Sequence, residues 1–405
     1  MKKISFLIFL LTGISLIGIA TSCSKLTDMI NPENGLCGPI GLSSTQAILF
    51  SQGNDEFFAT RTTATGLGPY FVATGCGSCH TSDNRGHPFT ILTRFGQTDS
   101  TGNKFLAEGG PQLGNFCLPG YTPQQVPPGA TSSKFIAPIT AGVGFLEAVP
   151  DSEILAMAAA NRNNPDGVRG HPNYNAIPSY VTPLYGAIQR SDGKYICRFG
   201  RKASTYNLLQ QVANAYNHDM GITSTFMPYN PYNYQDQTLQ SPSTPEVDNN
   251  TLTSNVFYVT CLQAPIQRDS SDPTVKRGNG VFTQIGCGTC HQQSLTTGYS
   301  PIASLSYQTF SPFTDLLVHD MGPGLDDGYT EGNAKTSEWR TTPLWGLGLA
   351  PNVQGGKTYL MHDGRAGSIE EAIRMHGGEA AASAGRFNNL SNDDRNALIT
   401  FLKSL

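Results

Sequence analysis

The stretch that decides the fold is Gly75-Cys76-Gly77-Ser78-Cys79-His80, which recurs as Gly286-Cys287-Gly288-Thr289-Cys290-His291. A Cys-x-x-Cys pair alone suits a redox dithiol, a tetrahedral metal or two thioether bonds. The adjoining His favours the third, because c-type haem is attached through two cysteines and ligated by the next histidine. A zinc site built from the four cysteines would leave both histidines unexplained. The motifs therefore predict two covalently bound haem c groups, with cofactor-binding residues Cys76, Cys79, His80, Cys287, Cys290 and His291; zinc and a bare dithiol are the alternatives.

The composition indicates a two-domain, loop-rich protein. The chain has 405 residues, enough for two domains that each bury a core. Charged residues make up 14% and the net charge is -4, which gives no basic surface for nucleic acid. With 44 Gly and 26 Pro, the helices should be short and joined by long loops. We expect a mainly α fold of two tandem cytochrome c-type domains that arose by internal duplication.

The N-terminus resembles a secretory signal. Met1-Lys2-Lys3 precedes an apolar run over residues 4–20, and small and polar residues lead to Cys23. We expect a lipoprotein signal peptide at 1–22, a lipid anchor on Cys23 and a location in the periplasm or cell envelope. The alternatives are ordinary cleavage nearby, with Cys23 incidental, or an uncleaved membrane anchor.

Four of the nine cysteines serve neither the haem motifs nor the lipid anchor: Cys37, Cys117, Cys197 and Cys261. An even number in an oxidising compartment predicts two disulfides, whose pairing the sequence leaves open.

An internal repeat extends beyond the two motifs. Residues 68–71 resemble 278–282, residues 138–144 resemble 343–348, and residues 200–211 resemble 364–372, in the same order. Each half closes with a helical pattern, at 247–262 and from Ser391 to the end, and Asp272-Pro273 in the polar linker between the halves is a helix-start signal. We expect a tether at 23–56, an N-terminal haem domain at 57–265 and a C-terminal cytochrome c domain at 266–405.

Three blocks carry a resemblance to a known family. Arg198–Thr223, His319–Gly328 and Leu360–Ala380 resemble the bacterial di-haem oxidoreductases, also labelled peroxidases or thiol oxidoreductases. These form a branch of the di-haem cytochrome c peroxidase superfamily. The resemblance runs from about Phe57 to the C-terminus and implies a di-haem oxidoreductase with two functionally different haems.

The resemblance implies a sixth ligand for the second haem. Relatives have an axial Met at the end of the helix that here contains Glu370-Glu371-Ala372, and the matching position is His376. The implied metal ligands are His80, His291 and His376, with Met375 as the alternative to His376. A bis-His haem has a lower potential than a His/Met one.

The resemblance also implies a reaction pocket at the first haem. Gln211 takes the position of a distal Gln, and Asp219 that of an acidic residue, which would move a proton during O–O cleavage. Tyr216 and His218 are alternative bases or exchangeable ligands. The calcium site of the relatives is not reproduced, because Lys357-Thr358-Tyr359 replaces part of it, so calcium stays an unsupported option. His87 and His171 precede prolines and are expected to be surface or structural residues.

The expected function is peroxide reduction at the haem of His80, with electrons relayed by the haem of His291. The external donor would be a small cytochrome, a cupredoxin or a quinol-linked protein. One alternative is a non-catalytic electron carrier, and another is the peroxide-dependent oxidation of a protein or thiol substrate. Trp339 and Trp345 fall near the expected inter-haem region, with core packing as the alternative role.

Overall fold

The structure is a computed structural model that describes residues 40–81, 85–237 and 244–405. The expected signal peptide, Cys23 and Cys37 lie outside the described residues. Within those three ranges, no helix has the length and apolar character needed to cross a membrane.

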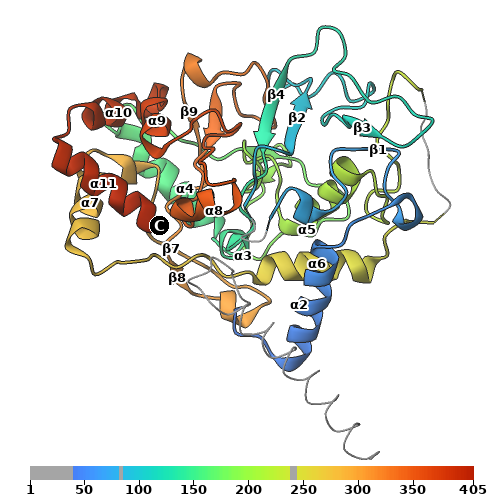
Figure 1. Cartoon of the computed structure of the whole chain (residues 1–405), viewed down its shortest axis with the longest axis horizontal. Helices are drawn as coiled ribbons and strands as arrows, with labels where there is room; N and C mark the ends of the chain where they lie inside the picture. The colour runs from blue at the N-terminus through green and yellow to red at the C-terminus, as the bar shows by residue number, and fades with distance from the viewer. Residues whose placement is uncertain (1–39, 82–84, 238–243) are drawn as a thin grey trace, which may run out of the picture.

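Helices dominate the regular structure (Figure 1). The α-helices are α2 (Ser44–Phe57), α3 (Val143–Glu147), α4 (Asp151–Ala160), α5 (Leu208–Asn214), α6 (Asn249–Cys261), α7 (Pro273–Gln284), α8 (Ala350–Val353), α9 (Ile369–Arg374), α10 (Ala381–Asn388) and α11 (Asn392–Ser404). Each Cys-x-x-Cys-His motif begins with a single 3₁₀ turn, Cys76–Ser78 or Cys287–Thr289.

The strands are short and form two-stranded antiparallel sheets, β1 with β3, β2 with β4, β5 with β6, β7 with β8, and β9 with β10. Their bounds are β1 (Tyr70–Phe71), β2 (Ile91–Phe95), β3 (Phe116–Cys117), β4 (Ser132–Ile136), β5 (Tyr174–Asn175), β6 (Tyr195–Ile196), β7 (Leu295–Thr296), β8 (Thr309–Phe310), β9 (Val318–Asp320) and β10 (Glu338–Arg340). The mainly α, loop-rich character is as expected. The division into two tandem cytochrome domains stays a prediction.

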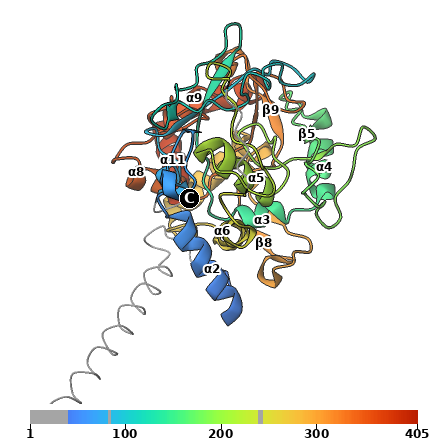
Figure 2. The same cartoon turned by 90° about the vertical axis from the view of Figure 1, so that its right-hand side faces the viewer.

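Two pairs of packed helices organise the fold. Helix α2 packs against α6 at the lower centre of Figure 1, and α7 packs against α11 on its left-hand side. Figure 2 shows α2 on the lower side, next to α6. A Cβ on Gly53 of α2 would lie 2.1 Å from the Ser254 carbonyl oxygen, and a Cβ on Gly278 of α7 would lie 2.1 Å from that of Ala397. Both crossings therefore require glycine.

The aromatic residues at these crossings repeat as well. Phe57 lies four residues after Gly53 and contacts Tyr258, with ring centroids 5.2 Å apart. Phe282 lies four residues after Gly278 and contacts Phe401 at 5.4 Å. Each phenylalanine also lies beside the histidine of its motif, His80 at 6.0 Å or His291 at 6.4 Å. Each half thus holds its motif against an equivalent pair of helices, α2 with α6 or α7 with α11.

This repeat corrects one sequence match and modifies the expected tether. Residues 68–71, matched above to 278–282, include strand β1, whereas 278–282 lie in α7. The counterpart of α7 is α2, whose residues 44–57 fall in the segment expected to be a tether but form a packed helix. The match was missed because the chain between α2 and the first motif is longer than that between α7 and the second.

A second sequence match is supported by the packing. Gly142 and Gly346 each precede a short helix with positive φ, 77° and 68°. Two residues later, a Cβ on Gly144 would lie 2.0 Å from the Thr260 carbonyl oxygen, and one on Gly348 would lie 1.8 Å from that of Lys403. Each segment therefore contacts the backbone of the closing helix of its own half, α6 or α11.

The predicted helix starts are confirmed. The Ser391 side chain accepts a hydrogen bond from the Asp394 amide at the start of α11, and Asp272 caps α7 with Pro273 as its first residue. The apolar stripe of α11, which includes Leu398, Phe401 and Leu402, is buried against α7.

The expectation of two disulfides is wrong for the cysteines that the structure describes. Cys117, Cys197 and Cys261 are all free. Cys117 is on β3, where its thiol donates to the Tyr121 carbonyl oxygen at 3.0 Å. Cys197 packs with Val181 and Tyr206, and Cys261 belongs to the large central core with α6. The three thiols lie in separate parts of the fold, so counting cysteines did not predict pairing.

Candidate functional site

Each Cys-x-x-Cys-His motif opens onto its own cavity. The His80 cavity is lined by Cys76, Cys79 and His80 and has about 1140 Å³ of space free of protein atoms, its open mouth included. The His291 cavity is lined by Cys287, Cys290 and His291 and has about 1700 Å³ measured in the same way. Both walls are largely apolar with a few polar groups, as in cofactor pockets.

His291 and His376 are both in the wall of the His291 cavity, with ring centroids 6.5 Å apart. A metal between two imidazoles has bonds of about 2.0–2.1 Å, and adding roughly 1.1 Å from nitrogen to ring centre on each side gives a span of about 6.3 Å. Met375 ends α9 and does not line the cavity. The spacing therefore suits an iron ligated by both histidines.

Hydrogen bonds fix the orientation of these two rings. His291 Nδ1 lies 2.9 Å from the Phe313 carbonyl oxygen, and His376 Nδ1 lies 2.7 Å from that of Ala372. A carbonyl accepts, so each Nδ1 carries the proton and each Nε2 keeps a lone pair for a metal. Burial lowers the pKa of both rings, that of His291 to about 4, which keeps them neutral at pH 7.

The distal residues expected for the first haem both line the His80 cavity. Gln211 comes from α5 and Asp219 from the π-helix Ala215–Asp219 that continues it. A π-helical turn is rare in proteins, and where one occurs it is frequently at a functional site. The chain thus brings Gln211 and Asp219 to the same cavity as His80.

The Asp219 carboxyl has a raised pKa. Burial raises its pKa to about 6, although the hydrogen bond from Gln112 and the nearby Arg94 charge both lower it. A carboxyl of this pKa can both take and return a proton near neutral pH. Gln112, which sequence reasoning missed, also donates to the His218 carbonyl oxygen and so positions this turn.

Tyr216 and His218, the alternative bases, do not line the His80 cavity. The Tyr216 hydroxyl donates to Glu56 Oε1 at 2.5 Å and accepts from Asn255 at 3.2 Å, and burial raises its pKa. Tyr216 therefore stays protonated. Burial lowers the pKa of His218 to about 4. Neither side chain has the position of a pocket base.

Helices α5 and α9 cover the two cavities in the same way. Asn207 caps α5 and Ser368 caps α9, and counting from either cap reaches cavity-lining residues at the same steps. By this count Gln211 corresponds to Ala372, and Ala215 corresponds to His376. The position that supplies an imidazole in one cavity supplies a methyl group in the other.

These features fit a protein with two haem sites, and the family comparison agrees. The model of the family described as "Di-haem oxidoreductase, putative peroxidase" matches residues 132–405. The chain belongs to this family. Haem is therefore the indicated cofactor and oxidoreductase the general class of enzyme. The match includes the second motif, α5 and α9, while the first motif lies before it.

Comparisons with curated proteins and with solved structures do not narrow the function further. No curated protein matches this di-haem oxidoreductase. A similar solved structure is "Kuenenia stuttgartiensis Hydrazine Synthase Pressurized with 20 bar Xenon", at 14% identity and a TM-score of 0.40, covering 92% of each chain.

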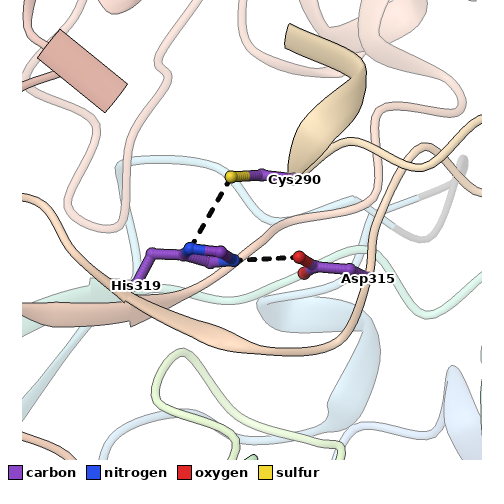
Figure 3. Close-up of side chains that lie close together, drawn as sticks. All are labelled: Cys290, Asp315 and His319. Atoms are coloured by element: carbon purple, nitrogen blue, oxygen red, sulfur yellow. Dashed lines mark hydrogen bonds and ion pairs between the residues drawn. The ribbon is translucent and has the colours of Figure 1, made fainter. Parts of the chain in front are cut away.

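The di-haem oxidoreductase also contains a buried charged network beside its second motif (Figure 3). His319 Nε2 lies 2.9 Å from Asp315 Oδ2, its Nδ1 lies 2.7 Å from Glu379 Oε2, and the same Nδ1 is 3.6 Å from Cys290 Sγ. Asp315 and the other partners raise the pKa of His319 well above its ordinary value against the effect of burial. Both ring nitrogens therefore carry protons. The Cys290, Asp315 and His319 cluster has metal-ligand residue types, but an imidazolium offers a metal no lone pair.

The cysteines of the di-haem oxidoreductase do not suit thiol redox chemistry. Burial raises the pKa of Cys76 and Cys287 to about 12 and that of Cys79 to about 11. Reactive thiols instead have lowered pKa values. The bare dithiol alternative therefore loses support.

Two segments of the di-haem oxidoreductase line both cavities, one with Ala137 and Ile139 and one that follows Trp339. Arg340, Thr342 and Pro343 line both, whereas Trp339 lines only the His291 cavity and Trp345 only the His80 cavity. Trp339 is stacked on His362, with ring centroids 3.6 Å apart, and its indole nitrogen donates to the Leu325 carbonyl oxygen. Both tryptophans are buried, so each packs in the interior and also faces a cavity.

His87 and His171 have structural contacts in the di-haem oxidoreductase. His87 is buried rather than on the surface: its Nε2 donates to the Ser78 carbonyl oxygen at 3.0 Å, inside the first motif. His171 lies 3.1 Å from Glu338. Neither lines a cavity.

Proposed function

We propose that this chain binds two haem c groups, one through Cys76, Cys79 and His80 and one through Cys287, Cys290 and His291, and that it reduces peroxide at the first. The observation that carries the proposal is that His376 and Ala215 occupy equivalent positions, each eight residues after the N-cap and just beyond the end of α9 or α5. A methyl group cannot ligate iron. The His80 cavity therefore keeps room for a substrate beside Ala215, whereas His376 closes the other site.

The residues around that open position suit peroxide. Haems held at His80 and His291 would supply the two electrons that reduction of hydrogen peroxide to two waters takes, and the two net protons come from solvent. Asp219 takes the proton of one peroxide oxygen and returns it to the leaving oxygen. Gln211 offers an amide that orients the bound peroxide, and Gln112 holds the Asp219 carboxylate by its hydrogen bond.

The second haem site suits electron supply. A haem held by both His291 and His376 would have no position left for substrate, and its two histidine ligands would set its potential. We propose that an external donor, a small cytochrome, cupredoxin or quinol-linked protein, reduces this haem in the periplasm or cell envelope. The lipid anchor at Cys23 would keep the protein at the membrane. The calcium option gains nothing from the described residues.

The experiment places a histidine at the open position. Wild-type protein should show one high-spin haem in at least one redox state and turn over peroxide with an artificial donor. Ala215→His should convert that haem to low spin and reduce turnover at least 100-fold, because the new imidazole occupies the sixth position. Asn214→His is the matched control, since Asn214 lies on the same helix but outside the cavity wall.

Each outcome distinguishes the alternatives. Two low-spin haems in every redox state, without peroxide turnover, would identify a non-catalytic electron carrier. Peroxide consumption that occurs only with a protein or thiol present would identify that molecule as the reductant. Loss of activity in Asn214→His equal to that in Ala215→His would contradict the role assigned to residue 215.

A further inference from the structure

Two arginines in the wall of the His291 cavity, Arg340 buried and Arg201 half-buried, have only neutral hydrogen-bond partners. Arg201 Nε and Nη2 donate to the Ile136 carbonyl oxygen at 3.0 and 2.7 Å. Arg340 Nε donates to the Gly200 carbonyl oxygen at 3.0 Å, and its Nη1 to that of Thr341 at 3.4 Å. The Arg340 amide also donates to the Arg201 carbonyl oxygen at 3.0 Å. The two residues are thus held together by the backbone.

Two other arginines that are withdrawn from solvent, the buried Arg198 and the half-buried Arg94, each have a carboxylate partner. Arg198 pairs with Asp151 at 2.5 Å, and Arg94 pairs with Glu331 at 2.8 Å. Over the described part of the chain, Arg201 and Arg340 form no such ion pair. A buried charge without a counter-charge is costly, so the absence of a carboxylate at both is unusual.

The electrostatics agree with this contact pattern. Burial and the charges of Arg340 and Arg85 together lower the pKa of Arg201 to about 9, opposed by Asp363. Burial lowers the pKa of Arg340 to about 10, with Asp315 as the opposing charge. The site as folded holds more positive charge than its own side chains balance.

Both guanidinium groups have N–H donors left over. A guanidinium carries five N–H bonds, and neither Arg201 Nη1 nor Arg340 Nη2 makes a hydrogen bond within the described residues. Both arginines are in the wall of the His291 cavity, together with Arg85. The unused donors therefore belong to a concentrated positive patch beside the second motif.

We propose that Arg201 and Arg340 form the carboxylate-binding site of the His291 cavity and bind the propionate groups of its haem. Haem carries two propionates, and guanidinium forks match carboxylates with paired hydrogen bonds. The inference rests on the proposed haem at His291. It adds a function for residues outside both motifs: Arg201 and Arg340 would hold the propionates and so fix the orientation of the haem, and the propionates would supply the counter-charge that the two arginines lack.

The test uses the haem-loaded full-length protein and two spectroscopic readouts. Arg201→Gln and Arg340→Gln should each shift the propionate bending modes in the resonance Raman spectrum, which report hydrogen bonds on the carboxylates. Each should also lower the midpoint potential of the low-spin haem, because a cation beside a haem favours the reduced state. Arg277→Gln is the control for loss of a positive charge, since its side chain lies on the exposed face of α7, paired with Asp394.

Conservative variants distinguish the loss of specific hydrogen bonds from misfolding. Arg201→Lys and Arg340→Lys keep the positive charge but lose the paired N–H donors of the guanidinium group. The midpoint potential should therefore stay near that of the wild type while the propionate modes still shift. Unchanged propionate modes in all four variants would overturn the inference even if the potential changed. A wild-type chain without haem at Cys287 and Cys290 would instead refute the proposed function, and haem content by mass spectrometry distinguishes the two failures.

Discussion

His291 and His376 lie on the wall of one cavity with their ring centroids 6.5 Å apart, and each ring donates its Nδ1 proton to a backbone carbonyl. His376→Ala should therefore open the sixth position and convert the second haem from low to high spin. His376→Met should keep low spin and raise the potential, since thioether ligation favours reduced iron. Electronic spectra and spectroelectrochemistry measure both changes. Met375→Ala should change neither; if it alone abolished the low-spin signal, Met375 would be the ligand.

The pKa of Asp219, about 6, predicts the acid limit of peroxide turnover. The base must be ionised to accept a proton, so the rate should fall as the pH drops through this value and level off above it. Asp219→Asn should lower turnover by about 10²–10⁴-fold and remove this limb of the pH profile. Haem content should stay at the wild-type level in the variant.

Gln112 provides an independent check on the same carboxyl. Its side-chain amide donates to Asp219 Oδ1 and stabilises the ionised form. Gln112→Leu should therefore move the acid limb to higher pH, because the carboxylate loses that hydrogen bond. A limb that stays in place in Gln112→Leu would show that another group titrates.

The glycine at a helix crossing predicts a stability difference within α7. Gly278→Ala places a Cβ 2.1 Å from the Ala397 carbonyl oxygen and should reduce the free energy of unfolding by about 1–3 kcal/mol or more. Gly280→Ala, on the same helix with open space around it, should instead increase stability by about 0.5–1 kcal/mol. Denaturant unfolding of the two variants measures the contrast. Equal effects would mean that α7 and α11 do not cross at Gly278.

The number of haems follows from the two motifs. Replacing Cys76 and Cys79 together by Ser should leave one covalent haem, and replacing Cys287 and Cys290 should leave the other, as measured by intact mass and a haem-stained gel. The first variant should retain the low-spin spectrum of the His291 site without peroxide turnover. A chain that kept two haems would contradict attachment through these cysteines.

Some of the packing could be read from the sequence and some could not. The caps of α7 and α11 are local, so Asp272-Pro273 and the spacing of Ser391 and Asp394 predicted the helix starts. The helix pairing of the first half was missed, because Gly53 and Phe57 are further from their motif than Gly278 and Phe282 are from theirs. The role of Gln112 could not be predicted from the sequence, because this glutamine belongs to no motif and is brought to Asp219 only by the tertiary fold.

The sequence by itself determined the two Cys-x-x-Cys-His motifs, the capped helices and the family, since these depend on residue types at short spacing. Only the tertiary structure decided which residues enclose each cavity. The equivalence of Ala215 and His376 becomes evident when α5 and α9 are seen to cover the two cavities in the same way. The pairing of Arg201 with Arg340 could be recognised only from the contact between β10 and a distant loop. Burial and the absence of a counter-charge are properties of packing rather than of sequence.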